Sequence, residues 1–340
     1  MDIYKKIKNF LKKNISGSLI DVLKLCRQLV IYPLNYLYDS YRYARYSSTF
    51  IGLLNKVKLR SMLNKNFHII EKGLSLYDTR SGFGQPVIVK TLKLLNRYIT
   101  NYGADSTVWA TINSLSEYQS FNLEHGVRLS FLDEALDDLK KLVPQSLNHE
   151  GGTVSITRKE ILSECSGSFK QLAKNRHSIR VFSKLPVDES LIREAANIAK
   201  KTPSVCNRQT TSIFVYGGEE QKKQILALQN GNRGFGHLAS HIVAVTSDLQ
   251  CFIGTGERNQ AYVDGGLMAM SFVYALQSLG IGSCFLNWSV TADLDMEIKK
   301  VAGIPASHVI VTLIAIGNIP DELLVAESPR LSLNDILYIQ

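Results

Sequence analysis

The chain has 340 residues, of which 45% are hydrophobic and 20% charged, and its formal net charge is +9. These proportions are those of a globular protein with room for about two domains, and they exclude a chain that is disordered throughout. No run near the N-terminus is apolar enough for a membrane span or a secretory signal. The five cysteines are scattered and form no CxxC pair, which predicts a reducing, cytoplasmic setting.

The positive charge is confined to one segment. Residues 1–60 hold twelve basic and three acidic residues, which accounts for the whole net charge of +9. Apolar residues recur there at helical spacing, at Ile3, Ile7, Phe10, Leu11 and Ile15. Such a basic helix either lies in a membrane interface or packs on the protein's own body with its lysines in solvent. Nucleic acid is not a predicted partner, because no binding motif and no second basic patch occur.

Residues 1–155 have mostly helical periodicity, with apolar-periodic stretches at 87–102 and 131–142. His68 and Glu71 are spaced to pair on one helix, and Arg80 could meet an anionic ligand. The alternative is that the helix simply ends at Gly73 and a tight turn follows. The polar stretch 145–153 is the candidate linker, so we predict a basic, helical N-terminal extension over 1–155.

From residue 168 onward, helical and strand patterns mix. Helices are predicted at 189–200 and 262–279, and β-branched runs predict strands at 213–216, 242–245 and 309–313, with a short one at 284–286. The strands are too few for a doubly wound sheet. We therefore predict an α+β domain over 168–340, with a mixed or antiparallel sheet flanked by helices.

Three stretches of this domain carry chemistry. The run Arg-His-Ser-Ile-Arg-Val-Phe at 176–182 places two guanidiniums and a hydroxyl close together, which suits a phosphate. The amides in the run at 203–209 suit the edge of a flat heterocycle. The glycines of Leu-Gly-Ile-Gly at 279–282 let the backbone approach a ligand. Taken singly, the first stretch is more typical of a solvated edge and the second of an ordinary turn, and no metal site is predicted.

In order and spacing, these stretches and Asp-Gly-Gly at 264–266 resemble the nitroreductase family of FMN-dependent oxidoreductases. The resemblance covers about residues 169–337. It implies an α+β homodimer with FMN at the subunit interface. It also implies that NAD(P)H reduces the flavin, which then passes electrons to a small acceptor such as a nitro compound or a quinone. Because this chemistry is centred on the flavin, no catalytic side chain is predicted.

The resemblance also implies cofactor-binding positions. Arg176 and Ser178 are expected at the FMN phosphate and ribityl chain, and Arg180 near the flavin pyrimidine. The remaining predicted positions are His177, in the same run, Asn207 and Gln209 at the pyrimidine edge, Asn287 and Trp288 near the flavin N5, and Arg330 at the phosphate.

Three departures from the family pattern keep an alternative open, and the first is that the domain is short by family standards. Ser328 and Pro329 stand where a second base is common, and Arg208 stands where a small residue is commoner. The alternative is a degenerate or non-catalytic protein of this fold, recruited to a membrane surface or to envelope polysaccharide machinery by its basic N-terminal segment. The stretch 68–84 looks like an extension found in some nitroreductase-like proteins of bacterial surface-polysaccharide gene clusters.

Overall fold

The computed structural model describes residues 17–46, 55–143, 151–165, 167–252 and 255–340. The predicted stripe at 3–15 and most of the predicted linker at 145–153 lie outside these residues. Internal contacts divide the chain into two compact units. One comprises Met1–Leu54 with Cys251–Gln260, and the other Asn55–Gln250 with Ala261–Gln340. The boundary predicted from the sequence, between 1–155 and 168–340, stays a prediction.

The first unit is dominated by one helix, α2 (Gly17–Tyr46), which contains Pro33 and contacts the short helix η5 (Thr255–Glu257). Large apolar side chains of α2 are exposed, among them Leu25 at 60% and Leu29 at 66%. None of the helices in the described ranges is long and apolar enough to cross a membrane.

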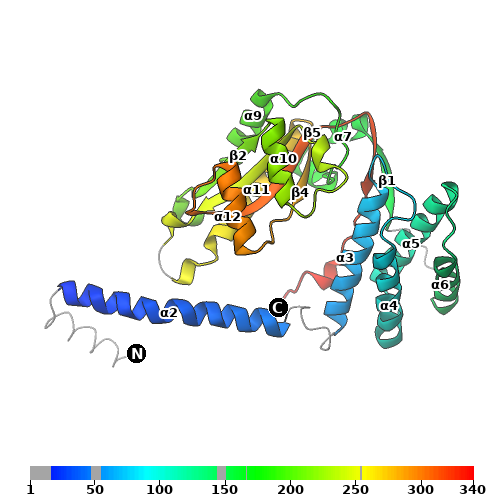
Figure 1. Cartoon of the computed structure of the whole chain (residues 1–340), viewed down its shortest axis with the longest axis horizontal. Helices are drawn as coiled ribbons and strands as arrows, with labels where there is room; N and C mark the ends of the chain where they lie inside the picture. The colour runs from blue at the N-terminus through cyan, green and yellow to red at the C-terminus, as the bar shows by residue number, and fades with distance from the viewer. Residues whose placement is uncertain (1–16, 47–54, 144–150, 166, 253–254) are drawn as a thin grey trace. The chain divides into compact units, whose positions relative to one another are not determined.

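The second unit begins with a helical region made of α3 (Lys56–Leu74), α4 (Gln85–Tyr102), α5 (Ser106–Glu124) and α6 (Ser130–Leu142) (Figure 1). Local sequence sets the helix ends: Asn55 caps α3 and Asp105 caps α5 through their side chains. α3 packs against α4 and α5, and α5 packs against α6. The helices predicted at 87–102 and 131–142 are confirmed.

The rest of the second unit is built on a four-stranded antiparallel sheet in the order β2-β3-β5-β4. Its strands are β2 (Thr211–Tyr216), β3 (His241–Asp248), β5 (His308–Asn318) and β4 (Ile281–Leu286). All four predicted strands fall within them. The predicted α+β class, with a helical region before an antiparallel sheet, is confirmed.

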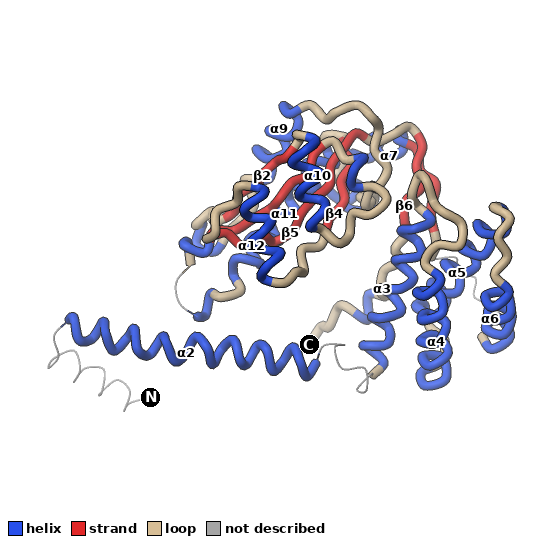
Figure 2. The backbone as a smooth tube through the Cα atoms, in the orientation of Figure 1, coloured by secondary structure: helices blue, strands red, loops and turns tan. Residues whose placement is uncertain are grey.

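Helices cover both faces of this sheet, because successive residues of a strand point to opposite faces. Ile242 and Ala244 of β3 join one core with α10 (Glu219–Leu228) and α12 (Ala292–Ala302). Val243 and Val245 join a second core with α9 (Glu189–Ala199) and α11 (Gln260–Ser278). Figure 2 shows α10 and α12 across the first face. α9 and α11 confirm the helices predicted at 189–200 and 262–279.

A second, two-stranded sheet joins the two parts of this unit. β1 (Thr153–Thr157) pairs antiparallel with β6 (Glu322–Ala326), and β6 also contacts α3. The short helices α7 (Arg158–Cys165) and α8 (Phe169–Lys174) then lead to the predicted cofactor segment. Ser168 and Gln171 form a capping box at the start of α8.

Candidate functional site

The segment from Arg176 to Ser183 lies along the edge of the four-stranded sheet. The backbone amide of Ile179 donates to Ser283 of β4 (2.9 Å), and that of Ser183 donates to Asn318 of β5 (2.9 Å). The Phe182 ring fills the space beside Gly317, where a β-carbon would overlap it. The buried side chains of Ile179 and Phe182 therefore anchor the segment and fix the position of Arg180 between them.

Arg180 is the most unusual residue of this segment, because its side chain is only 7% exposed. Its Nη2 lies 3.5 Å from Nε2 of His68 in α3. Its Nε and Nη1 are buried, and neither has a hydrogen-bond partner among the described residues. A buried guanidinium with unsatisfied N–H groups is costly, so the site is built for acceptor or anionic atoms of a ligand.

His68 connects Arg180 to two further groups. Its Nδ1 lies 3.4 Å from Oε2 of Glu71 and 3.3 Å from Oγ of Ser328. Glu71 is fully buried, and its Oε1 accepts the backbone N–H of Gly152 at 3.1 Å. The pairing predicted for His68 and Glu71 is confirmed, and it lies beside the predicted cofactor segment.

Three positive groups, those of Lys72, Arg176 and Arg180, act on the buried thiol of Cys284, and Arg330 acts on Arg176. We call Lys72, Arg176, Arg180 and Arg330 the cationic cluster. Burial raises the pKa of the Cys284 thiol, and the charges of Arg180, Lys72 and Arg176, with a side-chain hydrogen bond to Arg180, oppose that rise. Burial lowers the pKa of Lys72, and repulsion from Arg180 lowers it further. Cations held this close favour a ligand with negative charge.

Burial and neighbouring positive charges also lower the pKa values of Arg176 and His177, at the start of the segment 176–183. Burial lowers the pKa of Arg176, and the neighbouring Arg330 lowers it further. Burial also lowers the pKa of His177, followed by repulsion from Arg176 and Arg330. Ser178 is half-buried in the same segment. The structure therefore brings Arg176, His177, Arg180 and Arg330, all predicted cofactor-binding residues, into one neighbourhood.

Lys72 also links α3 to the predicted N5 side of the site. Its Nζ donates to the carbonyl of Gly231 (3.1 Å), and the amide of Gly231 donates to Oε1 of Gln229 (2.6 Å). The Nε2 of Gln229 then donates to the carbonyl of Asn287 (2.8 Å). Beside it, the Trp288 indole donates to Asp295 (3.1 Å). Hydrogen bonds thus run from the cationic cluster to the backbone of Asn287.

Asn207 and Gln209 lie in a different loop, where Cys206, Asn207 and Gln209 have positive φ values of 49°, 52° and 51°. Such strain in residues other than glycine is typical of functional loops. The backbone N–H of Val205 contacts the buried carboxylate of Asp264 in α11 (3.3 Å), which holds the loop in place. Within the described ranges, neither Asn207 nor Gln209 forms a hydrogen bond with the cationic cluster.

Sequence reasoning missed two contributors to the site, Lys72 and Ser328, and did not place His68 in it. His68, Glu71 and Lys72 follow the i, i+3, i+4 spacing of one helix face. That spacing indicated a shared face, but nothing in the sequence indicated that this face meets Arg180.

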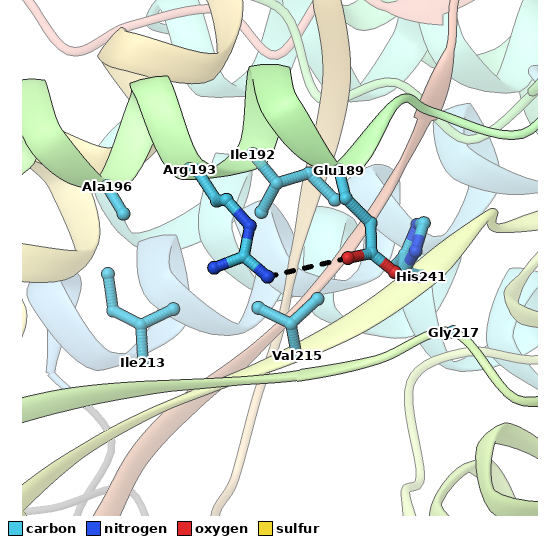
Figure 3. A pocket seen from close by; sticks show the side chains of 8 residues that line it. All are labelled: Glu189, Ile192, Arg193, Ala196, Ile213, Val215, Gly217 and His241. Carbon is cyan, nitrogen blue, oxygen red and sulfur yellow. Dashed lines mark ion pairs between the residues drawn. The ribbon is translucent and has the colours of Figure 1, made fainter.

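A separate hollow of about 370 Å³ lies between α9 and β2, and none of the predicted site residues lines it (Figure 3). An ion pair between Glu189 and Arg193 (3.7 Å) closes part of it. His241 at its edge is held by the hydroxyl of Ser240 (2.9 Å). The unsatisfied donors of Arg180, rather than this hollow, mark the candidate site.

The sheet domain is similar to known proteins. Residues 173–318 match the model of the nitroreductase family. Among solved structures, a nitroreductase family protein from Streptococcus pneumoniae has 20% identity and a TM-score of 0.44, covering 51% of this chain and 100% of that one. An FMN-dependent nitroreductase from Clostridium difficile has 20% identity and a TM-score of 0.38, covering 43% and 85%. No curated protein matches the chain.

Proposed function

Because the C-terminal half of the chain carries a nitroreductase family domain, we propose that the protein is an FMN-dependent oxidoreductase. In this proposal NAD(P)H supplies a hydride, and a small molecule such as a nitro compound or a quinone accepts the electrons. The observation that carries the proposal is Arg180, whose two unsatisfied buried donors lie inside the family match. Bound FMN would supply the two-electron chemistry, and the chain's residues would bind and orient it.

The residues around Arg180 fit this cofactor. Arg176 and Arg330, with the hydroxyl of Ser178, would hold the FMN phosphate by charge-assisted hydrogen bonds. A phosphate there would also relieve the repulsion that lowers the pKa of Arg176 and of His177. Arg180 would donate to the pyrimidine edge, where its positive charge stabilises developing negative charge. The backbone of Asn287 and Trp288 would lie on the opposite side of the ring system.

We also propose that the site is completed in a homodimer. Tyr262, Val263 and Leu267 of α11 leave large apolar side chains exposed, at 53%, 52% and 46%. Such a patch on a regular helix is typical of a protein interface. A second copy could then bring Asn207 and Gln209 to the cofactor. The molar mass in light scattering tests this, and Leu267→Asp is expected to shift a dimer toward monomer.

The direct test of the cofactor is the absorbance spectrum of the purified protein, followed by titration with FMN. We expect flavin absorbance, or quenching of flavin fluorescence when FMN is added. Arg176→Ala is expected to weaken FMN binding by about tenfold or more, because charge-assisted bonds are strong. Arg193→Ala is the matched control, since Arg193 is exposed on α9. Failure of the wild-type protein to bind FMN would overturn the proposal.

The second test concerns the reaction. NADPH or NADH oxidation is measured with a quinone or a nitroaromatic acceptor. Electron transfer that depends on FMN supports an enzyme. A protein that binds FMN and transfers no electrons to either acceptor class would favour the non-catalytic alternative.

Two observations favour a role at an anionic membrane surface. Apolar side chains of α2 are exposed, and residues 1–60 carry the net positive charge. Co-sedimentation with vesicles containing phosphatidylserine tests it. Deletion of residues 1–16 should weaken binding, because it removes five lysines, and salt should weaken it as well. Unchanged binding after the deletion would contradict a role for that segment. The cytoplasmic setting and the connection to polysaccharide machinery stay predictions.

A further inference from the structure

Helix α3 lies outside the matched family region, yet one of its residues contacts the key arginine of the site. The family match begins at residue 173, whereas His68 is more than a hundred positions earlier in the chain. Nε2 of His68 lies 3.5 Å from Nη2 of Arg180. The other two nitrogens of that guanidinium group, Nε and Nη1, are the ones without a hydrogen-bond partner among the described residues. The N-terminal region therefore supplies a direct neighbour of the predicted flavin contact.

The chemistry of the two partners determines which nitrogen of His68 carries the proton. A guanidinium group donates hydrogen bonds and never accepts them. Nε2 of His68 must therefore be the acceptor in this contact, and its proton must lie on Nδ1. Nδ1 faces two acceptors, Oε2 of Glu71 and Oγ of Ser328. The arrangement is consistent with a neutral histidine oriented by a buried carboxylate.

Glu71 is itself fixed, because it is fully buried and accepts the amide of Gly152. The groups that contact His68 come from three segments: Glu71 from α3, Arg180 from the sheet-edge segment, and Ser328 from the C-terminal loop. Arg330 donates to the carbonyl of Ser328, which orders the loop that meets His68. His68 thus lies where the helical region, the sheet domain and the C-terminal loop meet.

We infer that His68 is a positioning residue of the flavin site. Its Nε2 holds Nη2 of Arg180, so that Nε and Nη1 remain available to the electron-rich edge of a bound ligand. This inference rests on the proposed function for the identity of that ligand. It assigns to the N-terminal region a part in cofactor binding that the family domain does not supply by itself.

The first test needs no cofactor. Long-range ¹H–¹⁵N correlation spectra of the protein without FMN report the tautomer of each histidine, and His68→Gln identifies the signal of His68. We expect the Nδ1–H tautomer at neutral pH, although histidine in water favours Nε2–H. Arg180→Met is expected to shift the Nε2 resonance of His68 toward that of an unbonded ring nitrogen, whereas the proton stays on Nδ1, which faces Glu71 and Ser328. The Nε2–H tautomer in the wild-type protein, or an Nε2 resonance that Arg180→Met leaves unchanged, would overturn the inference.

The second test measures FMN affinity and the reduction potential of bound FMN in three variants. His68→Ala is expected to weaken binding by about tenfold, because a hydrogen bond that orients a charged group is lost. His68→Gln should retain most of the affinity, since its amide can accept from Arg180 and donate to Glu71. His125→Gln is the control, because His125 is an exposed histidine at the end of α5.

The two tests separate the inference from the proposed function. If wild-type protein does not bind FMN, the proposed function fails, and the tautomer, together with the Nε2 resonance in Arg180→Met, still decides whether His68 holds Arg180. If wild-type protein binds FMN and His68→Ala leaves both affinity and potential unchanged, the positioning role is wrong while the proposed function stands. Circular dichroism shows whether His68→Ala folds. If it does not, the comparison of His68→Gln with the wild type decides on the positioning role.

Discussion

Gly73 of α3 lies directly against the ring of Phe83, so closely that a β-carbon on Gly73 would overlap ring atoms Cε2 and Cζ. The ring has little freedom to move, because it packs edge-to-face on Tyr118 with centroids 4.9 Å apart. The carbonyl of Phe83 also accepts the Tyr118 hydroxyl (2.5 Å). The hydroxyl of Thr79 closes the turn by donating to the carbonyl of Gly73 (2.7 Å). The packing of Gly73 on Phe83 fixes the end of α3, which follows His68 and Lys72.

Gly73→Ala is therefore expected to destabilise the protein. Forcing one methyl group into a filled space costs about 1–3 kcal/mol. The free energy of unfolding from urea denaturation measures the loss. Gly266→Ala is the matched control, because Gly266 also lies within a helix and has open space around it. There the substitution should be neutral or slightly stabilising. Equal effects at both positions would contradict the packing argument.

Arg180→Met should have opposite effects on stability and on ligand binding. Removing a buried charge with unsatisfied N–H groups is expected to raise the free energy of unfolding of the FMN-free protein by about 1 kcal/mol or more. The same change should weaken FMN binding at least tenfold. Thermal unfolding and FMN titration measure the two effects, with Arg193→Met as the exposed control. A less stable variant would show that Arg180 has a structural role instead.

His177 should make stability depend on pH. Burial, followed by repulsion from Arg176 and Arg330, lowers the pKa of His177 below its ordinary value of about 6.5. The unfolded chain therefore binds a proton at a higher pH than the folded protein does. The free energy of unfolding should fall as pH drops below about 6.5, and be unaffected by this group at higher pH.

His177→Asn should flatten that pH dependence. Urea denaturation at pH 7.5, 6.5 and 5.5 compares the variant with the wild-type protein, and His125→Gln serves as the control. FMN should also reduce the slope of the wild-type protein, because its phosphate would favour the protonated histidine. Parallel pH profiles for His177→Asn and the wild type would show that this histidine is not the group responsible.

Truncation tests whether the helical region belongs to the folded sheet unit. Deleting residues 1–54 removes α2 and leaves the second compact unit, so its cooperative unfolding should be retained. Deleting residues 1–167 removes β1, the partner of β6, together with α3. Leu323 and Val325 of β6, which are buried, would then be exposed, and the fragment should aggregate. Size-exclusion chromatography and thermal unfolding compare the two. A stable, monodisperse second fragment would contradict this expectation.

The sequence by itself determined the local elements and the chemistry within single segments. The β-branched run in β3 and the helical periodicity in α4 are local properties, and both predictions were right. The run from Arg176 to Phe182 also shows its character within a few residues, because two guanidiniums so close together suit an anionic partner.

Only the tertiary structure decided how distant segments combine. That Arg180 is buried with unsatisfied donors depends on Phe182 filling the space beside Gly317, far along the chain. That His68 meets Arg180 depends on the packing of α3 against β6, and on the pairing of β6 with β1. Such contacts depend on the summed packing of many side chains, and no local pattern records them. Helical spacing therefore predicted the pair of His68 and Glu71, whereas only the fold placed that pair at the candidate site.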